Sequence, residues 1–296
     1  MTYGIFALSL AFIWGQAGIL CFGQAIFFGL GAYLMALTTL EKFSWFGGSQ
    51  AIGLILAVLG PGLAAHVVGQ LLFRGRGLSG AYFAIVTLAT AVIVEIIAQH
   101  WSYIGGFNGL LGVPPLVVIW REGLDAFITP MENYYTIFFS ALLIYLALLG
   151  MVRSPLGIVL ATLKDEEYRT RAFGYNIANL KIIAFTCSGA VAGIAGGLFT
   201  TQFGFVSPPL TGFALSTEVL IWVAVGGRGV LLAAFLGAIV VRYIENVLSD
   251  TLGSYWLMAL GTLFIAAVVV APRGLFGKLL QLPLPRRFRQ FVPKKL

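Results

Sequence analysis

Charged side chains are scarce in this sequence. Asp, Glu, Lys and Arg make up 10% of its 296 residues, whereas an ordinary soluble domain carries about a quarter. Apolar residues make up 59%, and the mean hydropathy is +0.97. This composition excludes an ordinary soluble domain and predicts a chain that crosses a membrane several times.

Residues that carry catalysis or bind metals are also rare. There are two histidines, His66 and His100, far apart and without an HExxH or Cys/His cluster, which leaves a metal or hydrolase site without ligands. Cys21 and Cys187 lie in apolar runs and are typical of inert buried thiols. No glycine-rich loop ends in Lys-Ser or Lys-Thr, so we do not expect the chain to bind and hydrolyse ATP. We therefore expect neither an enzyme nor a cofactor.

Long apolar runs fill most of the chain. A spanning helix needs roughly 20 apolar residues, and such segments lie near 5–22, 23–40, 51–72, 80–98, 133–152, 182–203, 213–248 and 254–271. The run 213–248 is long enough for two passes, divided around Gly226 to Gly229. We predict an all-α transmembrane bundle of about eight to nine spans, with one membrane domain over 1–272 and a basic tail over 273–296.

The basic residues indicate which ends of the spans face the cytoplasm. The 273–296 tail carries seven Lys and Arg residues and no acid, and cytoplasmic loops are enriched in such residues. We expect the tail, the loop with Arg74 and Arg76, and the segment 153–181 to lie inside, and the more acidic loop 99–132 to lie outside. These charges flank spans, where anionic lipid headgroups lie, so they favour membrane lipid over nucleic acid as partner.

One long polar segment, 153–181, interrupts the apolar sequence. Ser154 and Pro155 are typical of a helix start, Gly174 of a helix end, and Asn176 of a second start that runs into the next span. We predict two short helices at the membrane surface. A helix with an apolar stripe and a charged rim either lies on the headgroups or fills a groove in a partner.

Polar residues inside apolar spans are the default functional candidates in a membrane chain. Gln16 and Gln24 stand among glycines, which is typical either of a broken helix that lines a cavity or of a simple cytoplasmic turn. Asn108 stands in a glycine-rich loop that could be a plain turn. For Glu95 and Glu218 we favour wet helix ends over a proton relay. Arg242 and Glu245 are predicted to pair on one helix face. The candidates for a translocation path are Gln16, Gln24, Asn108 and Glu218.

Small residues recur every fourth position in the span 182–203. Gly189, Gly193 and Gly197 would share one helix face and let another backbone approach closely. This pattern is typical of helix packing within the chain, and a subunit or pore interface is the alternative.

Together these motifs resemble the permeases of the branched-chain amino acid and urea/amide class of bacterial ABC importers. The matching stretches run almost from end to end, and their order and spacing together are highly specific. They are Trp14-Gly15-Gln16-Ala17-Gly18, Phe22 to Tyr33, Gly80 to Ile85, Gly105 to Leu110, Ser154-Pro155-Leu156-Gly157, Gly174-Tyr175-Asn176, Glu218-Val219-Leu220, Gly226-Gly227-Arg228-Gly229 and Ala271 to Leu275.

The resemblance implies a non-enzymatic subunit of the inner membrane that works with partners. These would be a second, similar permease, two cytoplasmic ATPase subunits and an extracytoplasmic solute-binding protein. The segment 153–181 would dock into the ATPase. In importers it often reads Glu-Ala-Ala-x-x-x-Gly; here Gly174 fits, but Tyr168, Arg169 and Thr170 replace the rest. Relatives also usually carry another span before Trp14. The expected coupling residues are Gly157, Lys164, Asp165, Glu166, Glu167, Arg169, Arg171, Gly174 and Asn176.

The resemblance leaves the substrate open between two classes. Branched-chain or other hydrophobic amino acids come first because they are frequent in the family and suit an apolar bundle. The run 221–229 is more similar to the urea and short-amide branch. An ion-coupled secondary transporter would need buried titrating carboxylates, and a passive channel would need a polar pore. Both stay as more distant alternatives.

Overall fold

Helices carry almost all of the described chain. The computed structural model describes residues 1–42, 48–74, 80–116 and 130–252, together with 258, 261, 262, 274, 276 and 277. Within these residues the α-helices are α1 (Thr2–Ala17), α2 (Gln24–Thr39), α3 (Gln50–Phe73), α4 (Gly80–His100), α5 (Pro130–Arg153), α6 (Pro155–Asp165), α7 (Glu167–Ala172), α8 (Ile177–Phe203), α9 (Phe213–Gly226) and α10 (Leu231–Leu252). The described residues also form three short 3-10 helices, η1 (Ser102–Ile104), η2 (Gly106–Asn108) and η3 (Pro208–Thr211). There are two strands of two residues each among them, β1 (Leu110–Leu111) and β2 (Phe205–Val206).

The predicted helical membrane bundle is confirmed. Five described helices, α3, α4, α5, α8 and α10, are long and apolar enough to cross a membrane, and α1, α2 and α9 are shorter apolar helices. This agrees approximately with the expected number of spans. The break in the run 213–248 is also confirmed, although α9 has only 14 residues, fewer than a full crossing needs. The predicted span 254–271 and the basic tail lie almost entirely outside the described residues.

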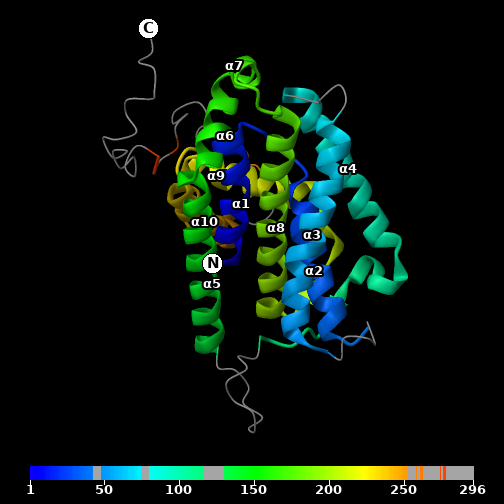
Figure 1. The fold of residues 1–296 in the computed structure, drawn as a ribbon. Helices are drawn as coiled ribbons and strands as arrows, with labels where there is room; N and C mark the ends of the chain where they lie inside the picture. The colour runs from blue at the N-terminus through cyan, green and yellow to red at the C-terminus, as the bar shows by residue number, and fades with distance from the viewer. Residues whose placement is uncertain are drawn as a thin grey trace.

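The helix α8 is the centre of the bundle and packs against α1, α2 and α3 (Figure 1). Small residues make this close packing possible. A side chain at Gly193 would overlap the backbone of α3 at Ala57, and one at Gly196 would overlap the backbone of α2 at Phe28. The helix α1 is buried almost all round, which explains why its apolar residues show no amphipathic stripe.

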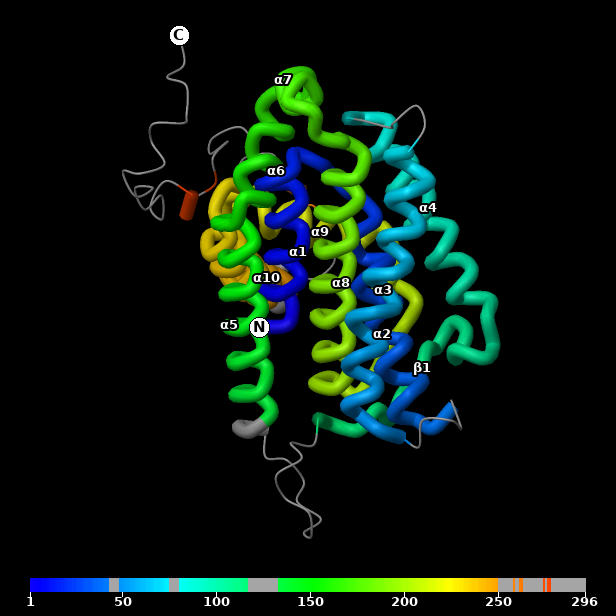
Figure 2. Tube along the Cα trace, viewed as in Figure 1, coloured from blue at the N-terminus to red at the C-terminus, as the bar shows by residue number. Residues whose placement is uncertain are grey.

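The two ends of the bundle are distinct. Figure 2 shows α6 and α7 at one end, and the end of α2 and the start of α3 at the other. At the second end β1 pairs antiparallel with β2. Gly105, Gly106 and Gly109 have positive φ angles of 94°, 55° and 72°, so this loop is the tight turn that its glycines predicted. Phe73, before Arg74, lines a pocket with Lys164 of α6. Arg74 and the segment 153–181 therefore lie at the same end.

The connection between α1 and α2 is buried irregular backbone. Residues 18–23 are not helical, and Ile19, Cys21 and Gly23 within them are buried. The amide of Phe22 donates to the Thr87 hydroxyl of α4, at 3.2 Å. The connection lines a pocket together with Lys164 of α6 and Glu167 of α7, so it lies at the end of the bundle that carries the polar segment. The connection is thus a turn at this end that neighbouring helices partly bury.

The polar segment folds into one more helix than predicted. The backbone is extended at Glu166, with φ −149° and ψ 100°, which separates α6 from α7. Lys164 thus stands in the last turn of α6 and Glu167 in the first turn of α7. A positive charge is favourable at the C-terminal end of a helix and a negative charge at the N-terminal end. Both interactions exist because the chain breaks between α6 and α7, and a single long helix would lose them. Asn176 caps α8 as expected, its side chain accepting from the Asn179 amide at 3.2 Å.

Candidate functional site

The segment formed by α6 and α7 presents an exposed, mixed surface at its end of the bundle. Tyr168 and Phe173 are 85% and 81% exposed. Two large aromatic side chains on one short segment are thus available for contact with a partner. Further coupling candidates are exposed around them, namely Asp165, Glu166, Arg169, Arg171, Gly174 and Asn176. Glu166 and Arg169 form an exposed ion pair, which contributes little to stability.

Other coupling candidates contact the spans instead. Gly157 is buried, and a side chain there would overlap the carbonyl of Val152 at the end of α5. Glu167 of α7 pairs with Lys181 of α8 at 2.9 Å. The nine residues predicted as one coupling surface thus divide into an outward group and an inward group. The inward group ties α6 and α7 to the spans.

Lys164 makes the most direct of these inward links. Lys164 is an exposed residue, but its Nζ donates a 2.7 Å hydrogen bond to the carbonyl of Gly15 in the last turn of α1. Its stem also packs on Gly18, the left-handed residue that ends α1. A cation at a helix C-terminus is favourable because the last carbonyls lack partners within the helix. Burial, and then the nearby charge of Arg228, lower the pKa of the Lys164 amine, and Asp165 opposes them.

A third segment meets the same helix end. Arg228, in the connection between α9 and α10, stacks over the ring of Trp14 with 5.4 Å between guanidinium carbon and ring centroid. A side chain at Gly15 would overlap the Arg228 carbonyl. The C-terminus of α1 is therefore held between α6 and the 227–230 connection. Movement of α6 would reach the buried α1–α2 connection without an intermediate element.

The four candidates for a translocation path do not come together. Gln24 is fully buried, and its Nε2 donates to the hydroxyls of Ser9 and Ser188 at 3.0 and 2.8 Å. It joins α2 to α1 and α8 and has no open face for a solute in this conformation. Gln16 is half-buried near the end of α1, whereas Asn108 is exposed at the β1–β2 end. The fourth candidate, Glu218, belongs to a separate charged cluster.

That cluster joins α9 and α10. Arg242 pairs with Glu245 at 2.8 Å, as its spacing predicted, and also lies 3.5 Å from Glu218. One guanidinium thus pairs with two carboxylates within the bundle, a costly arrangement unless the charges stay together. Glu95, in contrast, lies against Gly212 at the start of α9, where the helix end favours negative charge.

Three glycines of the predicted packing face, Gly189, Gly193 and Gly197, lie against α3. Their nearest neighbours include Ala57, Pro61 and Ala65. This places them in packing within the chain. Among the described residues no group of three or more His, Cys, Asp or Glu side chains could hold a metal ion.

Comparison with known proteins identifies the family to which this chain belongs. The family model described as the branched-chain amino acid transport system/permease component matches residues 1–270. The chain belongs to this permease family. It is 32% identical to the Escherichia coli high-affinity branched-chain amino acid transport system permease protein LivM, over 93% of this chain and 68% of LivM. No solved structure matches the chain.

Other relatives of the permease differ in their named transport systems. A probable branched-chain amino acid transport permease protein LivM of Methanocaldococcus jannaschii is 26% identical over 99% of this chain and 91% of its own length. The Yersinia pestis autoinducer 2 import system permease protein LsrC is 28% identical over 77% of this chain and 70% of its own length. Membership of the family therefore leaves the substrate open.

Sequence reasoning missed two contacts of the permease. It did not place Lys164 on α1, and it did not join Glu218 to Arg242. No spacing rule connects positions 149 residues apart, as Lys164 and Gly15 are. For Glu218 and Arg242 a signal existed, because opposite charges in neighbouring apolar spans favour pairing.

Proposed function

We propose that this chain is a membrane-spanning subunit of an ATP-driven importer that moves branched-chain or similar hydrophobic amino acids into the cell. The observation that carries the proposal is the link from the exposed α6–α7 segment through Lys164 to the end of α1. The exposed aromatics of that segment would bind a cytoplasmic ATPase, and the inward contacts would pass its motion to the spans. The chain performs no chemistry on the solute.

The complete transporter would contain further subunits. A second permease of the same family, two ATPase subunits and an extracytoplasmic solute-binding protein complete it, in the cytoplasmic membrane with the α6–α7 end inside. Similarity to LivM over 93% of this chain supports branched-chain amino acids as substrate. Urea or a short amide is the second candidate, favoured by the run 221–229.

Co-purification tests the assembly. The chain is purified from its host in mild detergent, and its partners are identified by mass spectrometry. Two ATPases and a second permease are expected. A chain that purifies alone, under conditions that preserve a known ABC complex, would favour a secondary transporter. Uptake without ATP would favour a channel.

Uptake by the reconstituted complex tests the substrate and the coupling. Labelled leucine uptake should require ATP and be displaced by leucine but not by urea. Glu167→Lys would set two lysines against each other, since Glu167 pairs with Lys181. Gly174→Pro is incompatible with the φ of 85° at that position. Both variants should insert normally and lose uptake. Normal uptake by either would refute the coupling role of this segment.

A further inference from the structure

A pocket of about 440 Å³ lies at the α6–α7 end. The α1–α2 connection, the start of α4, the end of α3 and the α6–α7 segment surround it. Its volume falls in the range of about 300–1,000 Å³ that is typical of small-molecule sites. The pocket is separate from the exposed aromatic surface of α7, but Lys164, Glu167 and Lys181 of the inward contacts lie at its wall.

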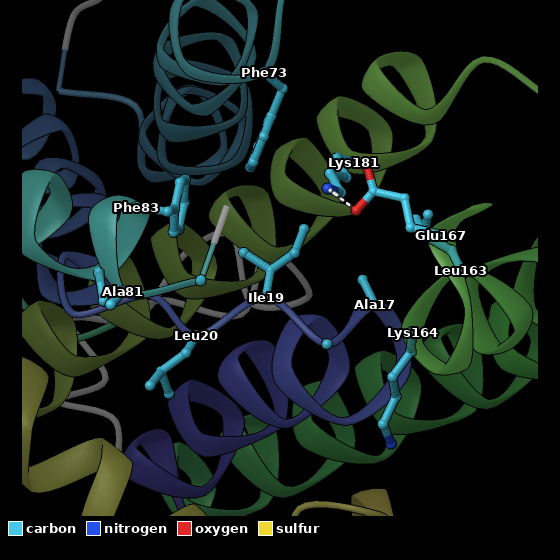
Figure 3. A pocket seen from close by; sticks show the side chains of 13 residues that line it. Ala17, Ile19, Leu20, Phe73, Ala81, Phe83, Leu163, Lys164, Glu167 and Lys181 are labelled. Atoms are coloured by element: carbon cyan, nitrogen blue, oxygen red, sulfur yellow. Dashed lines mark hydrogen bonds and ion pairs between the residues drawn. The ribbon is translucent and has the colours of Figure 1, made fainter. Parts of the chain in front are cut away.

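One side of the pocket is apolar and well supported. Phe73 and Phe83 stack with their ring centroids 5.0 Å apart. Phe185 of α8 meets both edge-on, at 6.0 and 5.8 Å. Figure 3 shows Ile19, from the α1–α2 connection, between these rings and the α6–α7 segment. Side chains held this firmly offer a fixed surface to an aliphatic group.

The opposite side carries both signs of charge. Glu167 and Lys181 form a 2.9 Å ion pair at the wall, with side chains 45% and 12% exposed. Figure 3 shows this pair beside the pocket and the Lys164 amine directed elsewhere, toward the Gly15 carbonyl that it binds. The ammonium of Lys181 has three donors and the carboxylate of Glu167 has further lone pairs. Each can therefore bind another charged group without breaking the pair.

We propose that this pocket binds a zwitterionic aliphatic amino acid from the cytosolic side. The ligand's carboxylate would bind Lys181, its ammonium would bind Glu167, and its side chain would pack on Phe73, Phe83 and Ile19. A carboxylate and an ammonium on one carbon match a pair of opposite charges 2.9 Å apart. The proposal rests on the function and orientation proposed above.

Binding there would inhibit import. The ligand would bridge the α6–α7 segment to Phe73 of α3 and Phe83 of α4, and would so oppose movement of α6 and α1 relative to those spans. A ligand that binds one arrangement more tightly shifts the population toward it. Rising amino acid inside the cell would thus hold the permease in this conformation.

Direct binding tests the site. Labelled leucine is titrated into the purified complete complex in detergent, without ATP and without binding protein. Glu167→Gln and Lys181→Met should each bind about tenfold more weakly or worse, the scale of one charge-assisted hydrogen bond. Glu41→Gln and Lys42→Met, the same changes at the β1–β2 end, should bind normally. Isopentylamine and 4-methylpentanoate, which each lack one charge, should compete at least about tenfold less well.

Several outcomes would overturn the site. Equal binding by the pocket variants and their controls places leucine elsewhere. A pocket filled by phosphatidylethanolamine that leucine does not displace identifies a lipid headgroup as the zwitterion. Thermal unfolding of each variant in the same detergent verifies that it is folded before its affinity is compared.

Transport separates this inference from the proposed function. Proteoliposomes holding ATP inside are loaded with or without unlabelled leucine, and initial uptake of external labelled leucine is measured. Absence of ATP-dependent uptake in unloaded vesicles refutes the proposed function, and the binding experiment still decides the site. Uptake that internal leucine does not reduce refutes the inhibitory role. The expected result is inhibition that the Lys42→Met complex retains.

Discussion

Replacing Lys164 with methionine tests the link between α6 and α1 most directly. The change keeps most of the stem that packs on Gly18 and removes the ammonium that donates to the Gly15 carbonyl at 2.7 Å. The variant should insert, assemble and hydrolyse ATP, because the exposed face of α7 is untouched. Transport per ATP hydrolysed should fall.

The size of that fall follows from the bond that is lost. Hydrogen bonds to charged groups contribute about 1.5–3 kcal/mol, and the partial exposure of Lys164 places this one at the lower end. About 1.4 kcal/mol changes an equilibrium tenfold. We therefore expect roughly tenfold fewer solute molecules moved per ATP hydrolysed, with part of the loss restored by Lys164→Arg.

The assay measures leucine uptake and phosphate release together in proteoliposomes that contain the complete complex. Lys42→Met, at the opposite end of the bundle, is the matched control and should keep the normal ratio. An unchanged ratio in Lys164→Met would refute the link. A parallel loss of both activities would mean that Lys164 serves assembly rather than coupling.

Three further predictions concern stability, measured by unfolding in detergent. Because the pKa of Lys164 is lowered in the folded protein, the unfolded chain binds the proton more tightly. The free energy of unfolding of wild type should therefore rise relative to that of Lys164→Met as the pH rises through the lowered pKa toward 10.5. A difference between the two proteins that stays constant or falls over this pH range would contradict the prediction. Gly196→Ala should destabilise by several kcal/mol because the new methyl group overlaps the α2 backbone, whereas Gly150→Ala, with nothing within 4 Å, should be neutral or stabilising by about 0.5–1 kcal/mol. Arg242→Met leaves two facing carboxylates and should cost about 3 kcal/mol, more than Glu245→Gln; equal losses would argue against the shared guanidinium.

The positions of helices and of helix ends could be predicted from the sequence wherever residues close together in the chain decide the backbone conformation. Apolar runs predicted the membrane helices, and the glycines at 226–229 predicted the break before α10. Asn176 predicted the start of α8. In each case neighbours within a few residues carry the free energy that decides the conformation. The polar segment 153–181 could be located in the same way, because so polar a stretch is costly inside lipid.

The sequence alone thus determined the class of the protein, its helices and the position of its polar segment. Only the tertiary structure decided which polar side chains face outward and which hold the bundle together. Lys164 bonds to α1, Gln24 is sealed between helices, and Glu218 shares Arg242 with Glu245. These contacts join residues far apart in the chain, and their free energy exists only after the helices have packed, so no local pattern specifies them.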